Sequence, residues 1–204
     1  MPYLPALILG LVLSVYWARV MRLAWKIHRQ AGHSPNFSPS EPIGKWLRIA
    51  WHPTVAVWIA QPYLVAFMKK LPWTFRPLIR SEALAWPAAA VVVLALAGTM
   101  VCWRKMGKSW RMGINPDEKT ELIVSGPYAY VRHPIYALSS LLMLASVAIV
   151  PSPLMLIACG IHLLLLQLEA RREEKYLAIH HGPGYLEYCR RVGRFVPRWH
   201  IRSA

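Results

Sequence analysis

The chain has 204 residues, of which 56% are hydrophobic, and it carries a formal net charge of +15. This composition excludes an ordinary soluble domain and indicates an integral membrane protein. The positive charge lies between long apolar runs instead of on one polar face, so anionic lipid headgroups are a better counter-charge than nucleic acid. The three cysteines, Cys102, Cys159 and Cys189, show no CxxC or metal-ligand spacing, and we expect neither a metal site nor a disulfide.

Five apolar segments predict the membrane-spanning helices of an all-α protein. They are residues 3–18, 49–68, 84–103, 135–150 and 154–168. Each is near, or a little short of, the roughly 20 residues that a helix needs to cross a bilayer. Pro53, Gln61 and Pro62 interrupt the second segment, so a kinked or partly re-entrant helix is the alternative there.

The distribution of Lys and Arg predicts the orientation. The first segment lacks a basic region before it and a cleavage site after it, so it is interpreted as a retained span and not as a signal peptide. With the N-terminus outside, eighteen Lys and Arg residues fall in the inner segments and four in the loop of residues 69–80. The positive-inside rule then places the C-terminus in the cytoplasm. The four positive residues in the outer loop run against the rule.

The motif "VRHPIY" opens the fourth apolar segment, and "EEKY" follows the fifth. Because the two segments are joined only by "PSP", they predict a tight helical hairpin that returns both motifs to one membrane face. Pro134 suits the first position of a helix. Arg132 and His133 would then sit at a helix N-terminus, which favours anions, opposite the carboxylates of Glu173 and Glu174. A cationic pole facing an anionic pole predicts a zwitterionic ligand.

Two further stretches flank this hairpin. The preceding loop, "GINPDEKTELIVSGPY", has turn formers and is expected to fold over a ligand. The tail, "GPGYLEYCRRVGRFVPRW", alternates aromatic and basic residues, which predicts an amphipathic helix on a membrane surface. Within the fifth segment His162 is interpreted as a hydrogen-bonded core residue, and His180 and His181 as surface residues. Each motif alone also fits an interfacial anchor, a solvated helix end or a lipid-surface stripe.

Together the motifs resemble the isoprenylcysteine carboxyl methyltransferase family and its bacterial relatives in the phospholipid methyltransferase and NnrU-like groups. The resemblance rests on "ELIVSGPYAYVRHPIY", the hairpin, and "EEKYLAIHHGPGYLEYCRRVGRFVP", in the family's order and spacing. It covers about residues 107–199. The apolar segments place three transmembrane helices in residues 1–106. The resemblance implies that residues 107–204 form a methyltransferase-like catalytic region in a bacterial inner membrane.

The resemblance further implies methyl transfer from S-adenosyl-L-methionine, held in a cytosol-facing pocket and leaving as S-adenosyl-L-homocysteine. The sequence has no strand, Gly-rich turn and helix of the Rossmann type. Residue by residue, the implied cofactor contacts are Thr120, Glu121, Leu122, Ile123, Tyr128, His133, Pro134, Ile135, Tyr136 and Glu173. In that set, the histidine suits the methionine carboxylate, and Glu173 suits hydroxyls or an ammonium group.

One position departs from the family pattern. In the isoprenylcysteine enzymes an arginine four residues before the first matching glutamate faces the substrate, and here that position is Glu169. Arg172, three residues on, shares its helix face. We therefore expect Glu169 and Arg172 to meet a lipidic or small amphipathic acceptor, neutral or amine-bearing, with Glu169 holding an amine or acting as a base. A helix-end ion pair of the two residues is the alternative.

Two other functional classes stay open at this point. A membrane reductase related to the sterol reductases would bind NADPH in a similar pocket and would need a basic cluster for the 2′-phosphate. A non-enzymatic membrane scaffold or small transporter would bind no cofactor at all.

Overall fold

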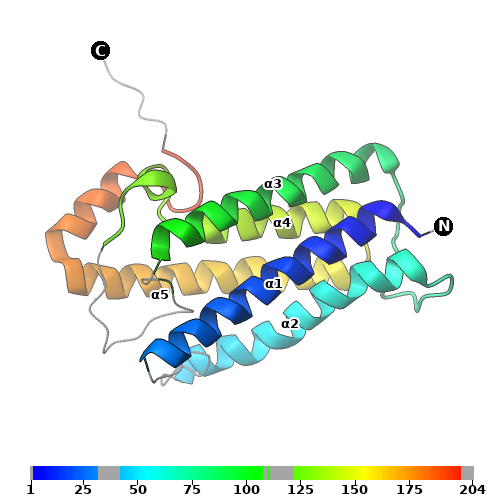
Figure 1. The fold of residues 1–204 in the computed structure, drawn as a ribbon, viewed down its shortest axis with the longest axis horizontal. Helices are drawn as coiled ribbons and strands as arrows, with labels where there is room; N and C mark the ends of the chain where they lie inside the picture. Colours follow the sequence, from blue (N-terminus) through cyan, green and yellow to red (C-terminus); the bar gives the residue numbers. More distant parts are fainter. Residues whose placement is uncertain (1, 32–41, 108–109, 111–121, 199–204) are drawn as a thin grey trace, which may run out of the picture.

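The computed structural model describes residues 2–31, 42–107, 110 and 122–198. Within these residues, five α-helices lie lengthwise in one bundle, with the start of α1 at one end and the described part of the tail near the other (Figure 1). They are α1 (Leu4–Ala31), α2 (Pro42–Phe67), α3 (Glu82–Met106), α4 (Pro134–Ile149) and α5 (Pro153–Arg191), with a short 3-10 turn, η2 (Gly126–Ala129), before α4. The described residues contain no β-strand beyond one isolated bridge, so the predicted all-α class is confirmed.

Three of the five helices, α1, α3 and α5, are long and apolar enough to cross a membrane. The protein is therefore an integral membrane protein. Helix α4 is apolar but has 16 residues, which at 1.5 Å per residue is about 24 Å, less than the hydrocarbon thickness of about 30 Å. Helix α2 has 26 residues, but Lys45, Arg48, His52 and Gln61 make it more polar than a typical span. Of the five expected spans, three are thus long and apolar enough to cross a membrane, namely α1, α3 and α5. Helices α2 and α4 pack beside them in the bundle.

Helix α2 buries Arg48, Thr54 and Gln61 in the bundle, whereas Lys45 and His52 stay exposed. It is one continuous helix in spite of Pro53 and Pro62, so the residues that interrupt the apolar segment do not end the helix. Trp58 is fully buried, and its indole N–H donates to the Ser146 hydroxyl of α4 at 2.9 Å. Gln61, also fully buried, donates to Ser152. Polar groups in an apolar interior must find such partners, so the residues that interrupt the hydropathy pattern of α2 link it to the hairpin.

The predicted hairpin is formed by α4 and α5. Pro134 occupies the first turn of α4, as expected, with His133 as the residue that precedes the helix. Ser152 caps α5 because its hydroxyl accepts a hydrogen bond from the Met155 N–H at 3.1 Å. The turn of the hairpin therefore lies at one end of the bundle. The motifs "VRHPIY" and "EEKY" lie together at the other end (Figure 1).

Helix α5 extends far beyond the predicted boundary at residue 168. It ends at Arg191, with a kink at Gly182, whose φ of +53° a residue with a side chain rarely adopts. Beyond the kink, Tyr185 and Tyr188 are buried against Leu122 and Leu177. The tail is thus helical up to Arg191, as expected, and its aromatic face packs against the protein itself.

The orientation can be tested with reporter fusions. One reporter placed after Ala204 should report the cytoplasm, and a second inserted after Lys70 should report the outside, because Figure 1 places the loop between α2 and α3 at the end of the bundle opposite the described part of the tail. Activity of alkaline phosphatase and fluorescence of a cytoplasm-dependent protein would measure the two locations. Both reporters on one side of the membrane would exclude this topology.

Candidate active site

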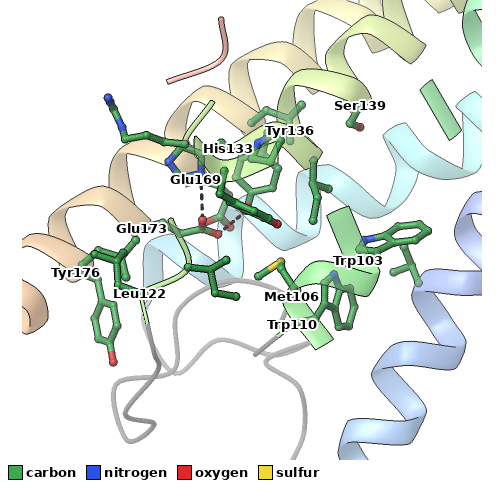
Figure 2. Close-up of a pocket in the computed structure, with 18 of the residues that line it drawn as sticks. Trp103, Met106, Trp110, Leu122, His133, Tyr136, Ser139, Glu169, Glu173 and Tyr176 are labelled. Atoms are coloured by element: carbon green, nitrogen blue, oxygen red, sulfur yellow. Dashed lines mark hydrogen bonds and ion pairs between the residues drawn. The ribbon is translucent and has the colours of Figure 1, made fainter. Parts of the chain in front are cut away.

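A cavity of about 210 Å³ lies where α3 ends and α4 begins. Figure 2 shows His133, Tyr136, Glu169 and Glu173 converging on one wall, with Trp103, Met106 and Trp110 on another. Of the residues expected at the site, the lining contains Leu122, Ile123, Tyr128, His133, Pro134, Ile135, Tyr136, Glu169 and Glu173. Arg172 does not line the cavity but contacts Glu169. Thr120 and Glu121 lie outside the described residues.

Glu174 of α5 is the centre of an ion cluster beside this cavity. Its carboxylate accepts hydrogen bonds from Arg132 Nε at 3.1 Å and Nη2 at 2.8 Å, and from Arg194 Nε at 3.0 Å and Nη2 at 2.5 Å. His133 Nε2 lies 3.3 Å from the same carboxylate. The Glu174 side chain is only 13% exposed, so these contacts are stronger than pairs on an open surface. One carboxylate therefore joins α5, the start of α4 and the tail.

The backbone of the tail pairs with the residues before α4. The Arg132 N–H donates to the Gly193 carbonyl at 2.8 Å, and the His133 N–H donates to the Arg194 carbonyl at 3.0 Å. A Cβ added at Gly193 would collide with the carbonyl oxygen of Val196, so only glycine fits this approach. These two N–H groups are taken by the tail, so a ligand at this helix start must be held mainly by side chains.

Glu173 and His133 form the polar wall of the cavity. The Tyr136 hydroxyl donates to Glu173, and His133 Nδ1 lies 3.5 Å from the Glu173 carboxylate. The rings of His133 and Tyr136 stack, with centroids 5.5 Å apart. Burial alone would lower the pKa of His133, but the carboxylates of Glu173 and Glu174 outweigh it and raise that pKa above its ordinary value. The predicted cationic and anionic poles thus contact each other directly instead of facing one another across an open gap.

Glu169 lies in the middle of α5 and is buried, so it is not at a solvated helix end. It is 3% exposed, and one of its carboxylate oxygens accepts a hydrogen bond from Arg172 Nη1 at 2.8 Å. Arg48 of α2, 7% exposed, lines the same cavity. A buried carboxylate is retained only with such partners. The expected pair of Glu169 and Arg172 is present, and its carboxylate is buried at the cavity wall.

The aromatic wall was not found by sequence reasoning. It comes from α1, α2, α3 and Trp110, and its rings are Tyr16, Trp17, Trp51, Trp103 and Trp110. The N-terminal half has no diagnostic motif, and the only clue in the sequence was the ten tryptophans. His162 also lines the cavity and, as expected, is buried and hydrogen-bonded, with Nε2 3.0 Å from the Ser139 hydroxyl.

Three tyrosines from the tail side close the cavity: Tyr176, Tyr185 and Tyr188. The Tyr188 hydroxyl donates to the Tyr128 carbonyl at 2.5 Å. The Tyr128 hydroxyl is buried with no hydrogen-bond partner in the described structure, and burial raises its pKa. A neutral buried hydroxyl beside a cavity is a ready partner for a polar ligand. The described residues hold no group of three His, Cys, Asp or Glu side chains placed to bind a metal ion.

Comparison with known proteins agrees with the motifs. Residues 88–179 match the model of the isoprenylcysteine carboxyl methyltransferase (ICMT) family, so the resemblance is confirmed for α3, α4 and α5 up to Ile179, and this region is similar to methyltransferases. The match begins earlier than expected, inside α3, and ends before the tail. The chain is also 27% identical over 114 residues to the nickel-cobalt-cadmium resistance protein NccN of Alcaligenes xylosoxydans xylosoxydans, covering 55% of this chain and 53% of that relative. The chain thus spans about half the length of this relative.

Substitution of Glu174 tests the ion cluster. Glu174→Gln should lower the free energy of unfolding by roughly 3 kcal/mol, because it leaves Arg132 and Arg194 without their buried counter-charge. Glu187→Gln is the matched control, since Glu187 forms an exposed pair with Arg191 at 3.7 Å and should change stability by less than about 0.5 kcal/mol. Denaturant unfolding in detergent micelles measures both. Equal losses in the two variants would contradict the proposed role of the cluster.

Proposed function

We propose that this protein is an integral membrane methyltransferase that transfers a methyl group from S-adenosyl-L-methionine to a lipidic or small amphipathic acceptor. The observation that carries the proposal is the gathering of the motif residues around one cavity, from the loop, α4 and α5. The match of residues 88–179 to a methyltransferase family supports it. Residues 107–204 would form the catalytic region, residues 1–106 the N-terminal helices, and the cavity would open toward the cytoplasm of a bacterial cell.

The residues of the cavity fit the chemistry of this cofactor. Its amine and ribose hydroxyls suit the Glu173 carboxylate, and its own carboxylate suits His133. The buried Tyr128 hydroxyl, without a partner in the described structure, would gain one. Leu122, Leu177 and the tyrosine rings would enclose the adenine, because flat apolar surfaces favour such packing. Thr120 and Glu121 stay predicted contacts of the loop outside the described residues.

The residues of the chain would align the acceptor with the methyl group and exclude water from the site. Bound S-adenosylmethionine supplies a methyl group already activated by a sulfonium. The cluster of Glu174 with Arg132 fixes the wall that carries His133 and Tyr136. The aromatic wall keeps bulk water from the reacting centre, where alignment of the nucleophile accounts for most of the rate. Glu169, buried beside Arg172 on the wall that also carries Glu173 (Figure 2), would accept a proton from an amine or other protonated nucleophile.

The NADPH alternative receives less support from the described residues. Recognition of a 2′-phosphate requires free basic side chains in the pocket. Among the described residues, the arginines that line the cavity are Arg48 and Arg132. Arg48 is buried near Glu169, and Arg132 is already bonded to Glu174. Arg190, Arg191 and Arg198 are exposed and do not line the cavity.

Calorimetry on detergent-purified protein tests the cofactor. S-Adenosylhomocysteine should bind, and NADPH should not. Glu173→Gln should weaken S-adenosylhomocysteine by about 1 to 3 kcal/mol, the scale of a hydrogen bond to a charged group, whereas Glu187→Gln, far out on the exposed tail, should leave binding unchanged. Saturable NADPH binding without S-adenosylhomocysteine binding would reject the methyltransferase proposal. An equal loss in both variants would reject Glu173 as a direct contact.

The acceptor is tested at Glu169. If Glu169 removes a proton from the acceptor, Glu169→Gln should lower kcat for tritiated methyl transfer into extractable lipid by about 100-fold while S-adenosylhomocysteine affinity is retained. Transfer to a farnesylcysteine carboxylate should be spared, because a carboxylate needs no base. Arg172→Lys is the companion variant, since it keeps the charge next to Glu169. Loss of both activities to the same degree in Glu169→Gln would show that the residue holds the fold and not the acceptor's proton.

A further inference from the structure

The loop between α2 and α3 carries a surface that the proposed function does not use. Its large exposed apolar side chains, taken with the last residue of α2, are Phe67, Met68, Trp73, Leu78 and Ile79. Its exposed cations are Lys69, Lys70, Arg76 and Arg80. Residues 67–81 contain no Asp or Glu. All of this stretch is described by the structure, and we call it the cationic loop.

The cationic loop has a fixed backbone. The Leu78 N–H donates to the Pro151 carbonyl at 2.8 Å, and the Leu154 N–H donates to the Thr74 carbonyl at 3.0 Å. Gln61 of α2 donates to the Phe75 carbonyl at 3.4 Å. The loop is therefore anchored on the turn between α4 and α5, and its apolar side chains point outward although the backbone is held against the protein.

The short hairpin sets the depth of this loop. Helix α4 has 16 residues, or about 24 Å, which falls roughly 6 Å short of the hydrocarbon thickness. The cationic loop covers the turn at the end of α4, and a hairpin this short would place it where the hydrocarbon meets the headgroups. Trp73, Leu78 and Ile79, at 73%, 63% and 70% exposed, would be costly in water at about 25 cal/mol per Å². At this depth the bilayer covers them.

We propose that the cationic loop binds the headgroups of anionic phospholipids in the leaflet at the end of the bundle opposite the cavity. Charge complementarity selects this partner, because none of the four cations forms an ion pair with a carboxylate among the described residues. Arg80 lies 5.4 Å from the Tyr3 ring centroid, which ties the loop to α1. Basic residues beside interfacial aromatic and aliphatic side chains favour anionic lipid surfaces. This role also accounts for the four positive residues that run against the positive-inside rule, and it is independent of methyl transfer.

The test uses the full-length chain in nanodiscs of phosphatidylcholine, with and without phosphatidylglycerol. Hydrogen–deuterium exchange should show that phosphatidylglycerol slows exchange of the amides in residues 67–81. The triple variant Lys69→Gln, Lys70→Gln, Arg76→Gln should lose this protection and should bind phosphatidylglycerol at least roughly tenfold more weakly, since each cation near an anionic surface favours binding. Native mass spectrometry counts the lipid retained by each protein.

Two controls decide the interpretation. Arg190→Gln, Arg191→Gln, Arg198→Gln removes the same charge from the exposed tail and should leave protection of residues 67–81 unchanged. Equal protection in phosphatidylcholine alone, or protection that survives in the triple variant, would overturn the proposal. Protection by soluble glycerol phosphate in detergent equal to that by phosphatidylglycerol would also overturn it, because the loop would then bind a free anion and not a membrane headgroup.

Discussion

The carboxylate of Glu174 holds together three segments that lie far apart in the sequence. Arg132 stands before α4, Arg194 stands in the tail, and both bond to this one side chain of α5. The charged side chains of Glu174 and Arg132 are both poorly exposed, and such charges are stable only when they are paired and hydrogen-bonded. The cluster therefore fixes the start of α4 against α5. The parallel backbone pairing of Arg132 and His133 with the tail adds to the same constraint. The wall of the cavity, and with it the stacked His133 and Tyr136, follows from this arrangement.

The cavity joins two parts of the chain with different chemical characters. The C-terminal part supplies the charged and hydroxyl groups, and the N-terminal helices supply most of the tryptophan surface. Such a division suits a reaction in which one end of the site recognises a polar cofactor and the other accepts an apolar molecule from the bilayer. The family match does not include α1 and α2, so the part of the cavity that these helices line is where this chain has most room to differ from the proteins that it resembles.

Much of the fold followed from hydropathy, because apolar runs of about 20 residues have few alternatives in a bilayer. The hairpin and the meeting of His133 with Glu173 followed from the short "PSP" turn. Sequence periodicity did not find the continuation of α5 to Arg191, since the charged run after Leu168 resembles a helix end until α4 and the tail pack against it. It also missed the aromatic wall, because a tryptophan facing lipid and one facing a cavity have the same local pattern. The role of Glu174 needed the tail to fold back, which only tertiary packing shows.

The central claim is that S-adenosylmethionine binds in this cavity. Ultraviolet cross-linking of tritiated S-adenosylmethionine to the purified protein, followed by peptide mapping, tests it most directly. We expect the label in peptides containing residues 122–136 or 169–188, and we expect excess unlabelled S-adenosylhomocysteine to suppress it. Label confined to other parts of the chain, or label that the competitor does not reduce, would contradict the account.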